Sequence, residues 1–182
     1  MTKKVRGFEI ISKYEGEGVN LPARATKNAA GYDFQASEDV VIPSAIKAGL
    51  KLAKARLFAK FAGHENLVTE KDVHLKPTLV PTGIKAYMGD DEYLQLANRS
   101  SNPLKRFLLL ANGVGVIDAD YYNNEGNEGH IMFQFVNFGL TDIHIKKGEN
   151  IGQGTFLPFL KADGDTGEHA RERTGGFGST NK

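Results

Sequence analysis

Apolar residues in this chain fall into many short runs that are separated by glycine, proline and asparagine. Short runs broken by turn residues are typical of strands, and no strand–helix–strand rhythm accompanies them. The sequence therefore predicts an all-β chain with a closed or double-sheet architecture. The expected strands cover residues 5–12, 30–36, 39–43, 78–86, 92–97, 107–110, 130–137, 143–145 and 151–160.

One stretch, residues 45–61, has neither alternation nor proline. Its apolar residues recur at helical spacing: Ile46, Leu50, Ala53, Leu57 and Phe61. Most of its basic residues fall on the other side, so we predict a basic amphipathic helix that docks on the strands by its apolar face. A polar loop follows to about residue 76. Such helices also bind partner proteins or nucleic acids, and that interpretation stays open.

Length and composition narrow the class of protein. A chain of 182 residues is expected to form one domain, and its net charge of +1 makes general binding to nucleic acid unlikely. There is no cysteine, so a disulfide framework and a thiolate site are excluded. No apolar run approaches membrane-spanning length, and we expect a soluble, cytoplasmic protein.

The stretch from Asn112 to Tyr121 carries the most suggestive chemistry, and we predict that it forms part of a hairpin. In a strand, Val116, Asp118 and Asp120 would share one face. Its two glycines permit a sharp bend or close contact with a flat ligand. A carboxylate beside apolar residues at such a bend suits a general base. Taken alone, the pattern is ambiguous, because a hairpin with surface aspartates also explains it.

Five short motifs along the chain, this stretch among them, resemble those of the trimeric dUTP pyrophosphatases (dUTPases) in order and spacing. They are Ala30-Gly31-Tyr32-Asp33, Arg99-Ser100-Ser101, Asn112 to Tyr121, Gly152-Gln153, and the segment from Arg173 to Thr180. The resemblance implies a distorted jelly-roll β-barrel over residues 1–160, with one helical insert at about 45–76. Residues 161–182 would form a glycine-rich flap.

The resemblance implies that Asp118 is the general base for water attack on the α-phosphorus of dUTP, which yields dUMP and pyrophosphate. Asn112 and the backbone at Gly115 and Val116 would bind uracil. Tyr121 would pack against the sugar, where a ribose 2′-hydroxyl would collide.

The phosphate contacts implied by the resemblance come from other motifs. Arg99 offers a planar fork that matches phosphate oxygens, and it would act with Ser100, Ser101 and Gln153. Asp33 would help to hold Mg²⁺ through water. The family commonly carries an arginine where this chain has Asn150, which leaves one supporting ion pair open.

The C-terminal segment resembles a flap that closes over the substrate. Arg173, Phe177, Gly178 and Ser179 are its expected contacts, with Arg171 as the alternative to Arg173. In the family this flap closes over the pocket of a neighbouring subunit, so the resemblance implies a homotrimer with shared active sites.

Two alternatives remain at this stage. A dCTP deaminase shares the barrel and the Arg-Ser-Ser motif, but its chemistry calls for a glutamate base. The other alternative is a regulatory protein that uses the dUTPase body, and the basic insert, to bind a partner protein.

Overall fold

A computed structural model describes residues 4–62, 76–166, 173 and 176 of the chain. The strands in these residues are β1 (Gly7–Ile10), β2 (Tyr32–Gln35), β3 (Val40–Ile42), β4 (Thr78–Pro81), β5 (Ile84–Tyr87), β6 (Glu92–Asn98), β7 (Leu108–Leu110), β8 (Gly115–Asp118), β9 (Met132–Asn137), β10 (Ile143–Ile145) and β11 (Asn150–Pro158). The α-helices are α1 (Ala45–Phe61) and α2 (Ser101–Arg106), and 3-10 turns occupy Ser12–Tyr14 and Ala119–Tyr121. The predicted all-β class with one inserted helix is confirmed.

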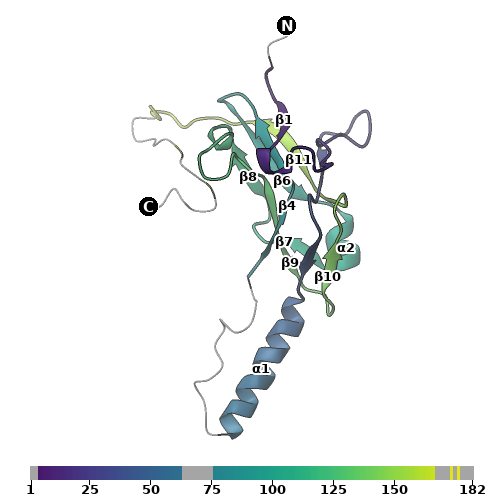
Figure 1. Cartoon of the computed structure of the whole chain (residues 1–182). Coiled ribbons are helices and arrows are strands. Elements are labelled where there is room, and N and C mark those ends of the chain that lie inside the picture. Colours follow the sequence, from purple (N-terminus) through teal and green to yellow (C-terminus); the bar gives the residue numbers. More distant parts are fainter. Residues whose placement is uncertain (1–3, 63–75, 167–172, 174–175, 177–182) are drawn as a thin grey trace.

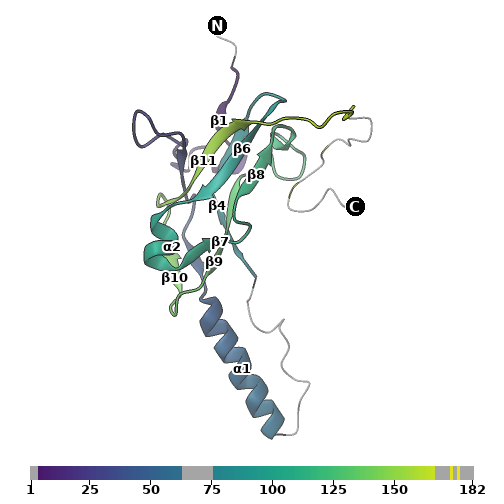
Figure 2. The same ribbon diagram turned by 180° about the vertical axis from the view of Figure 1, so that it is seen from behind.

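The strands form four antiparallel sheets that are wrapped around one core (Figures 1 and 2). The largest sheet has the order β2-β11-β6-β8, and a second has the order β4-β9-β7. The pairs β1-β5 and β3-β10 make two smaller sheets. Neighbours in these sheets come from distant parts of the chain, as in a jelly roll, so the motifs are held by long-range pairing.

The core is aromatic and aliphatic, and it requires close approach of β11. Phe34, Phe133 and Phe135 are completely buried. The ring centroid of Phe133 lies 5.7 Å from that of Phe34 and 6.0 Å from that of Phe135. A Cβ at Gly152 would lie 2.0 Å from the Phe133 ring, a distance that no side chain could tolerate. Only glycine therefore allows β11 to cross this ring, which explains the glycine of the Gly152-Gln153 motif.

Helix α1 has the predicted bounds, but its predicted docking is wrong. Leu50, Leu57 and Phe61 are 64%, 55% and 84% exposed, and α1 projects away from the strands (Figures 1 and 2). The one residue of α1 that is buried, Leu52, lies on the opposite side of the helix from Leu50. The apolar residues are thus spread around the helix, which makes it less amphipathic than their spacing indicated.

The base of α1 is fixed to the loop before β10. The Ser44 side chain caps the helix by accepting a hydrogen bond from the Lys47 backbone N–H at 3.0 Å. Asp142 accepts from the Ser44 backbone N–H at 3.0 Å and pairs with the Lys47 side chain at 3.0 Å. These contacts explain why the helix begins where it does, although no strand covers its exposed face.

The predicted hairpin around residue 112 is wrong. β7 pairs with β9, whereas β8 pairs with β6, so the two segments belong to different sheets. The intervening turn is closed by a hydrogen bond from the Gly113 N–H to the Leu110 carbonyl at 3.0 Å. The strand also ends at Asp118, and Asp120 lies in a 3-10 turn rather than on the face that Val116 and Asp118 share.

Candidate active site

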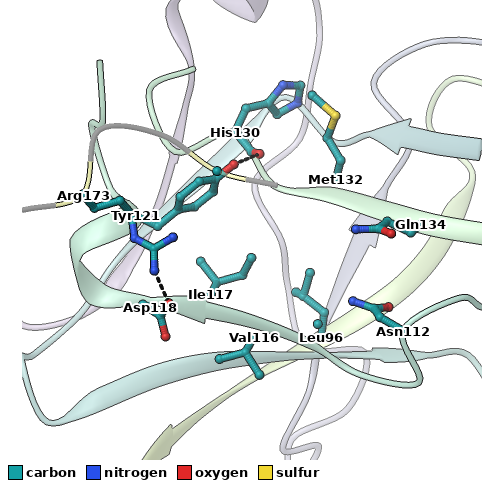
Figure 3. A pocket seen from close by; sticks show the side chains of 12 residues that line it. Leu96, Asn112, Val116, Ile117, Asp118, Tyr121, His130, Met132, Gln134 and Arg173 are labelled. Carbon is teal, nitrogen blue, oxygen red and sulfur yellow. Dashed lines mark hydrogen bonds and ion pairs between the residues drawn. The ribbon is translucent and has the colours of Figure 1, made fainter. Parts of the chain in front are cut away.

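A cavity of about 200 Å³ opens beside β8 and brings together six of the predicted site residues (Figure 3). These six are Asn112, Gly115, Val116, Asp118, Tyr121 and Arg173. Two further lining residues, Ile117 and Gly176, lie within the quoted motifs but were not named as contacts. Sequence analysis missed the other four: Leu96, His130, Met132 and Gln134. We call the group Asn112, Gly115, Val116, Asp118 and Tyr121 the β8 half-site.

β8 is the edge strand of its sheet, because only β6 pairs with it among the described strands. The backbone N–H and C=O groups along its other edge are therefore free to bind a ligand. The amide of Asn112 lines the same cavity. Together these groups suit a flat ligand edge that carries both donors and acceptors.

The Asp118 carboxylate lies at the mouth of this cavity, with its side chain 48% exposed. The guanidinium of Arg173 donates to Asp118 and, at 2.8 Å, to Asp120. Its central carbon lies 5.8 Å from the centre of the Tyr121 ring. In this structure, therefore, Arg173 contacts carboxylates of its own chain.

Gly176 also approaches the Tyr121 ring closely. A Cβ at Gly176 would lie 2.6 Å from the Tyr121 ring, so a glycine is required for this contact. Three other predicted flap contacts, Phe177, Gly178 and Ser179, lie outside the described residues, as does Arg171.

Tyr121 forms one wall of the cavity and is 6% exposed. Its hydroxyl donates to the His130 carbonyl oxygen at 3.1 Å and accepts from the Asn127 side-chain amide at 2.8 Å. Burial raises the pKa of the Tyr121 hydroxyl, and the hydrogen bond from Asn127 opposes that rise. The tyrosine is therefore neutral and fixed in orientation at physiological pH.

His130 is a lining residue that no sequence motif indicated. Its ring is 5% exposed, and its Nε2 accepts a hydrogen bond from the Gly83 backbone N–H at 2.9 Å. Burial, assisted by the positive charge of Lys13, lowers the pKa of His130 to about 4. The imidazole is thus neutral over most of the pH range and supports the wall that contains Tyr121.

The lowered pKa of His130 predicts a specific acid sensitivity. Below the ordinary value of 6.5 the unfolded chain binds a proton at this histidine, whereas the folded chain does not until about pH 4. The contribution of His130 to the free energy of unfolding is therefore fully present above pH 6.5, and about 3 kcal/mol is lost as the pH drops to 4. We expect His130→Gln to remove this part of the pH dependence in urea unfolding measured from pH 7 to 4. The exposed His144, changed to Gln, is the matched control, and an unaltered slope in His130→Gln would contradict the assignment.

A second group of predicted residues lies on the β11 side of the sheet. Asp33 on β2 and Gln153 on β11 are direct cross-strand partners. A Cβ at Gly31 would lie 2.6 Å from the Gln153 side-chain oxygen, so the glycine of the first motif makes room for that amide. With Arg99, Ser100 and Ser101 at the end of β6, these residues form what we call the β11 half-site.

Arg99 is held in place by a backbone carbonyl of β11. Its Nη1 donates to the Asn150 carbonyl oxygen at 3.0 Å. Asn150 stands where the resemblance leads one to expect arginine, and its carbonyl orients Arg99. The remaining guanidinium N–H groups can then serve a ligand.

The short helix α2 was missed by sequence analysis, because Ser101-Asn-Pro103 is typical of a turn. Proline is tolerated in the first turn of a helix, where its missing N–H has no intrahelical partner. Asn102 is buried and donates to the Ile151 carbonyl oxygen at 2.9 Å and to the Asn98 side chain at 2.8 Å. These bonds fix the Arg99–Ser101 loop against β11.

The two half-sites are well separated on one chain. Gln153, the partner of Asp33, lies opposite Ala97 on β6, whereas Asp118 lies opposite Tyr93. Four residues along a strand correspond to about 13 Å, and the three strand spacings from β2 to β8 add about 14 Å across the sheet. Asp33 and Asp118 therefore cannot act on the same phosphate group within one chain.

The described residues hold no group of three or more His, Asp or Glu side chains that could bind a metal ion by themselves. Within the same residues, no helix is both long enough and apolar enough to cross a membrane.

Comparisons with known proteins give a consistent result. The family model described as dUTPase matches residues 55–181. The deoxyuridine 5'-triphosphate nucleotidohydrolase of Lactococcus lactis is 46% identical over 178 residues, which cover 97% of this chain and 98% of that protein. The corresponding protein of Rickettsia typhi is 30% identical and covers 93% of this chain and 94% of its own length.

Solved structures agree with this. The crystal structure of a dUTPase from Streptococcus mutans is 41% identical, with a TM-score of 0.67, and covers 87% of this chain and 99% of its own. A dUTPase from phage phi11 of Staphylococcus aureus has a TM-score of 0.59 over 88% of this chain and 94% of its own. At 15% identity, this second likeness speaks for the fold alone.

Proposed function

The chain belongs to the dUTPase family, and we propose that it hydrolyses dUTP to dUMP and pyrophosphate in sites built from the half-sites of different copies. One observation carries this proposal. The β8 half-site has the chemistry to bind a nucleoside and activate water, the β11 half-site has the chemistry to bind phosphates, and one chain keeps them apart.

Uracil recognition is assigned to the free edge of β8 together with Asn112. A uracil edge presents acceptor, donor and acceptor groups, which strand backbone and one amide side chain can satisfy. Cytosine would leave part of this polar edge mismatched, and a mismatched buried hydrogen bond costs far more than one misplaced methyl group. The methyl group of thymine would be excluded by a steric clash with the strand edge.

Asp118 is proposed as the general base. Its half-exposed carboxylate is accessible to water at the cavity mouth, where it would remove a proton as the water oxygen attacks the α-phosphorus. The bond from that phosphorus to the bridging oxygen breaks, and pyrophosphate leaves. A carboxylate is a weak base at neutral pH, so orientation of the water contributes much of the rate.

The β11 half-site would bind the phosphate chain. Arg99 can form paired hydrogen bonds with phosphate oxygens, since within residues 4–62 and 76–166 its side chain has one hydrogen-bond partner, the Asn150 carbonyl. Ser100, Ser101 and Gln153 add neutral donors beside it. We assign Arg173 to the phosphates as well, which requires it to exchange Asp118 for substrate.

The residues present fit a magnesium ion that is bound mainly by the substrate. Mg²⁺ prefers oxygen ligands and keeps several waters, and the described residues provide no protein cage for it. Asp33, beside Gln153, would hold such an ion through its waters. The bound ion would neutralise charge on the triphosphate.

A homotrimer is the proposed assembly. The outward face of the β4-β9-β7 sheet carries Leu79 and Leu109, each 42% exposed, with Met132 and Val136 half-buried beside them. An apolar sheet face of this kind is suited to contact with another copy. Such contact would bring a β8 half-site and a β11 half-site from different chains together.

Neither alternative explains the whole chain. Membership of the dUTPase family leaves the dCTP deaminase interpretation without support.

Helix α1 takes no part in either half-site, and its exposed Leu57 and Phe61 are suited to contact with a partner protein. That role would be additional to hydrolysis.

The direct test is pyrophosphate release by the purified protein with Mg²⁺, measured separately on dUTP, dTTP, dCTP and UTP. We expect turnover of dUTP and rates at least about a hundredfold lower with the others. Ammonia release from dCTP would contradict the proposed reaction, and so would comparable turnover of dTTP.

A further inference from the structure

The loop that follows Tyr121 is tied to this tyrosine by hydrogen bonds from two asparagines. Asn124 donates to the Tyr121 backbone carbonyl at 2.8 Å, and Asn127 donates to its hydroxyl at 2.8 Å. Both ends of the tyrosine are therefore held by the same short loop. No motif of the sequence analysis includes these asparagines.

The two asparagines also fix each other. The Asn124 amide donates to the Asn127 side-chain oxygen at 2.9 Å, and the Asn127 backbone N–H donates back to the Asn124 side-chain oxygen at 3.1 Å. The Asn127 side-chain oxygen accepts a further bond from the Gly129 N–H at 3.1 Å. With its oxygen engaged twice, the Asn127 amide can present only its NH₂ group to Tyr121.

This arrangement determines what the hydroxyl of Tyr121 can offer a ligand. Its proton points to the His130 carbonyl oxygen, and one of its acceptor positions is taken by Asn127. The part of the side chain that remains for a sugar is the carbon ring. A ring face gives a 2′-hydroxyl no hydrogen bond, and burying an unpaired hydroxyl is unfavourable.

We infer that Asn127 is a positioning residue for sugar selection, which holds the Tyr121 hydroxyl away from the sugar and so disfavours a ribonucleotide. The inference rests on the proposed function, because it assigns the Tyr121 wall to the sugar of dUTP. Asn127 itself does not line the cavity and acts through the tyrosine.

Asn127→Asp is the sharpest variant. An aspartate keeps the oxygen that accepts from Asn124 and Gly129 but has no N–H for Tyr121, so the tyrosine hydroxyl would turn its proton toward the carboxylate. The acceptor position on the hydroxyl oxygen that Asn127 occupied would then be open to a ribose 2′-hydroxyl. We expect the ratio of kcat/KM for dUTP to that for UTP to fall about tenfold, which corresponds to the loss of one hydrogen bond. If hydrolysis of dUTP itself becomes less efficient, the change should be a higher KM at unchanged kcat, since the sugar wall binds substrate and transition state alike.

Asn123→Asp is the matched control, because it adds the same charge to the same loop. Asn123 is exposed, accepts from the Lys85 side chain at 2.7 Å, and has a left-handed backbone (φ 55°) that aspartate also tolerates. We expect it to leave the dUTP-to-UTP ratio unchanged. A ratio that is unchanged in Asn127→Asp, or equal losses on both nucleotides, would overturn the inference.

Titration of Tyr121 separates this inference from the proposed function. Its ionisation can be followed at the tyrosinate absorption band as the difference between each protein and its Tyr121→Phe counterpart. We expect Asn127→Asp to move this ionisation to higher pH, because a carboxylate replaces the donor. An unmoved titration would refute the hydrogen bond even if dUTP is hydrolysed. If the unmodified protein does not hydrolyse dUTP, the proposed function fails while the titration still decides the bond.

Discussion

Replacing Asp118 with asparagine should lower the rate of dUTP hydrolysis about a thousandfold, which is the usual contribution of a general base. Asparagine has nearly the same shape and can still line the cavity, but it cannot accept a proton from water. We therefore expect kcat to fall while dUTP still binds. The measurement is pyrophosphate release, together with the affinity for dUTP by calorimetry.

Asp120→Asn is the matched control for this experiment. Asp120 is the other carboxylate that pairs with Arg173, and its side chain is 56% exposed, but it does not line the cavity. We expect less than about a tenfold change, since only part of an exposed ion pair is lost. A larger loss in Asp120→Asn than in Asp118→Asn would show that the base has been assigned to the wrong residue.

Mixing two inactive variants should restore activity if each site draws on two chains. Asp118→Asn damages the β8 half-site and Arg99→Ala damages the β11 half-site, so neither variant alone should turn over dUTP. In oligomers formed from equal amounts of both, half of the sites receive an intact β8 half-site and half receive an intact β11 half-site. About one quarter of the sites receive both, and we expect about a quarter of the original activity.

The control for this experiment is a mixture of Asp118→Asn with Gly115→Val, which damages the same half-site twice. Because a Cβ at Gly115 already lies 3.1 Å from the Leu96 side chain, valine would distort β8 locally. This mixture should stay inactive at every ratio. Absence of recovery in the first mixture, with mixed oligomers verified by mass spectrometry, would place the whole site within one chain.

Sequence alone could predict the elements whose signals are local. The bounds of α1 follow from the absence of proline between Ala45 and Phe61 and from the capping residue Ser44. Both signals depend on neighbouring residues only. Most strands likewise lie within the predicted ranges. The position of α1 was not predictable, because residues such as Leu50 are apolar whether or not another element covers them.

The errors have a common physical origin in long-range pairing. The stretch around Gly113 contains a true turn, but β7 and β8 leave it for different sheets, and only distant partners decide that. α2 was missed because Asn102 is stabilised by Ile151, about fifty residues away in the chain. Local turn propensity at Ser101–Pro103 therefore gave a misleading signal.

In the candidate site, too, the residues with local sequence signals were predictable and those that depend on long-range contacts were not. The motifs named Asp118 and Tyr121, and the structure places both at one cavity with Asn112. His130 and Asn127 could not be found from the sequence, because their role depends on burial and on bonds to Tyr121. Nor could the separation of Asp33 from Asp118 be foreseen, since it follows from strand order and register.

The projecting helix has a consequence for long-range electrostatics. Residues 45–61 carry five lysines and arginines and no acidic residue, and removing these five charges from the net +1 leaves −4 for the rest of the chain. The residues outside α1 therefore oppose the approach of an anionic triphosphate by their net negative charge. Charges farther apart than about 8 Å are largely screened at physiological salt, so a phosphate at the β11 half-site interacts mainly with Arg99. Substrate capture thus depends on contact chemistry, because the cluster of positive charge lies on α1, which projects away from the strands (Figures 1 and 2).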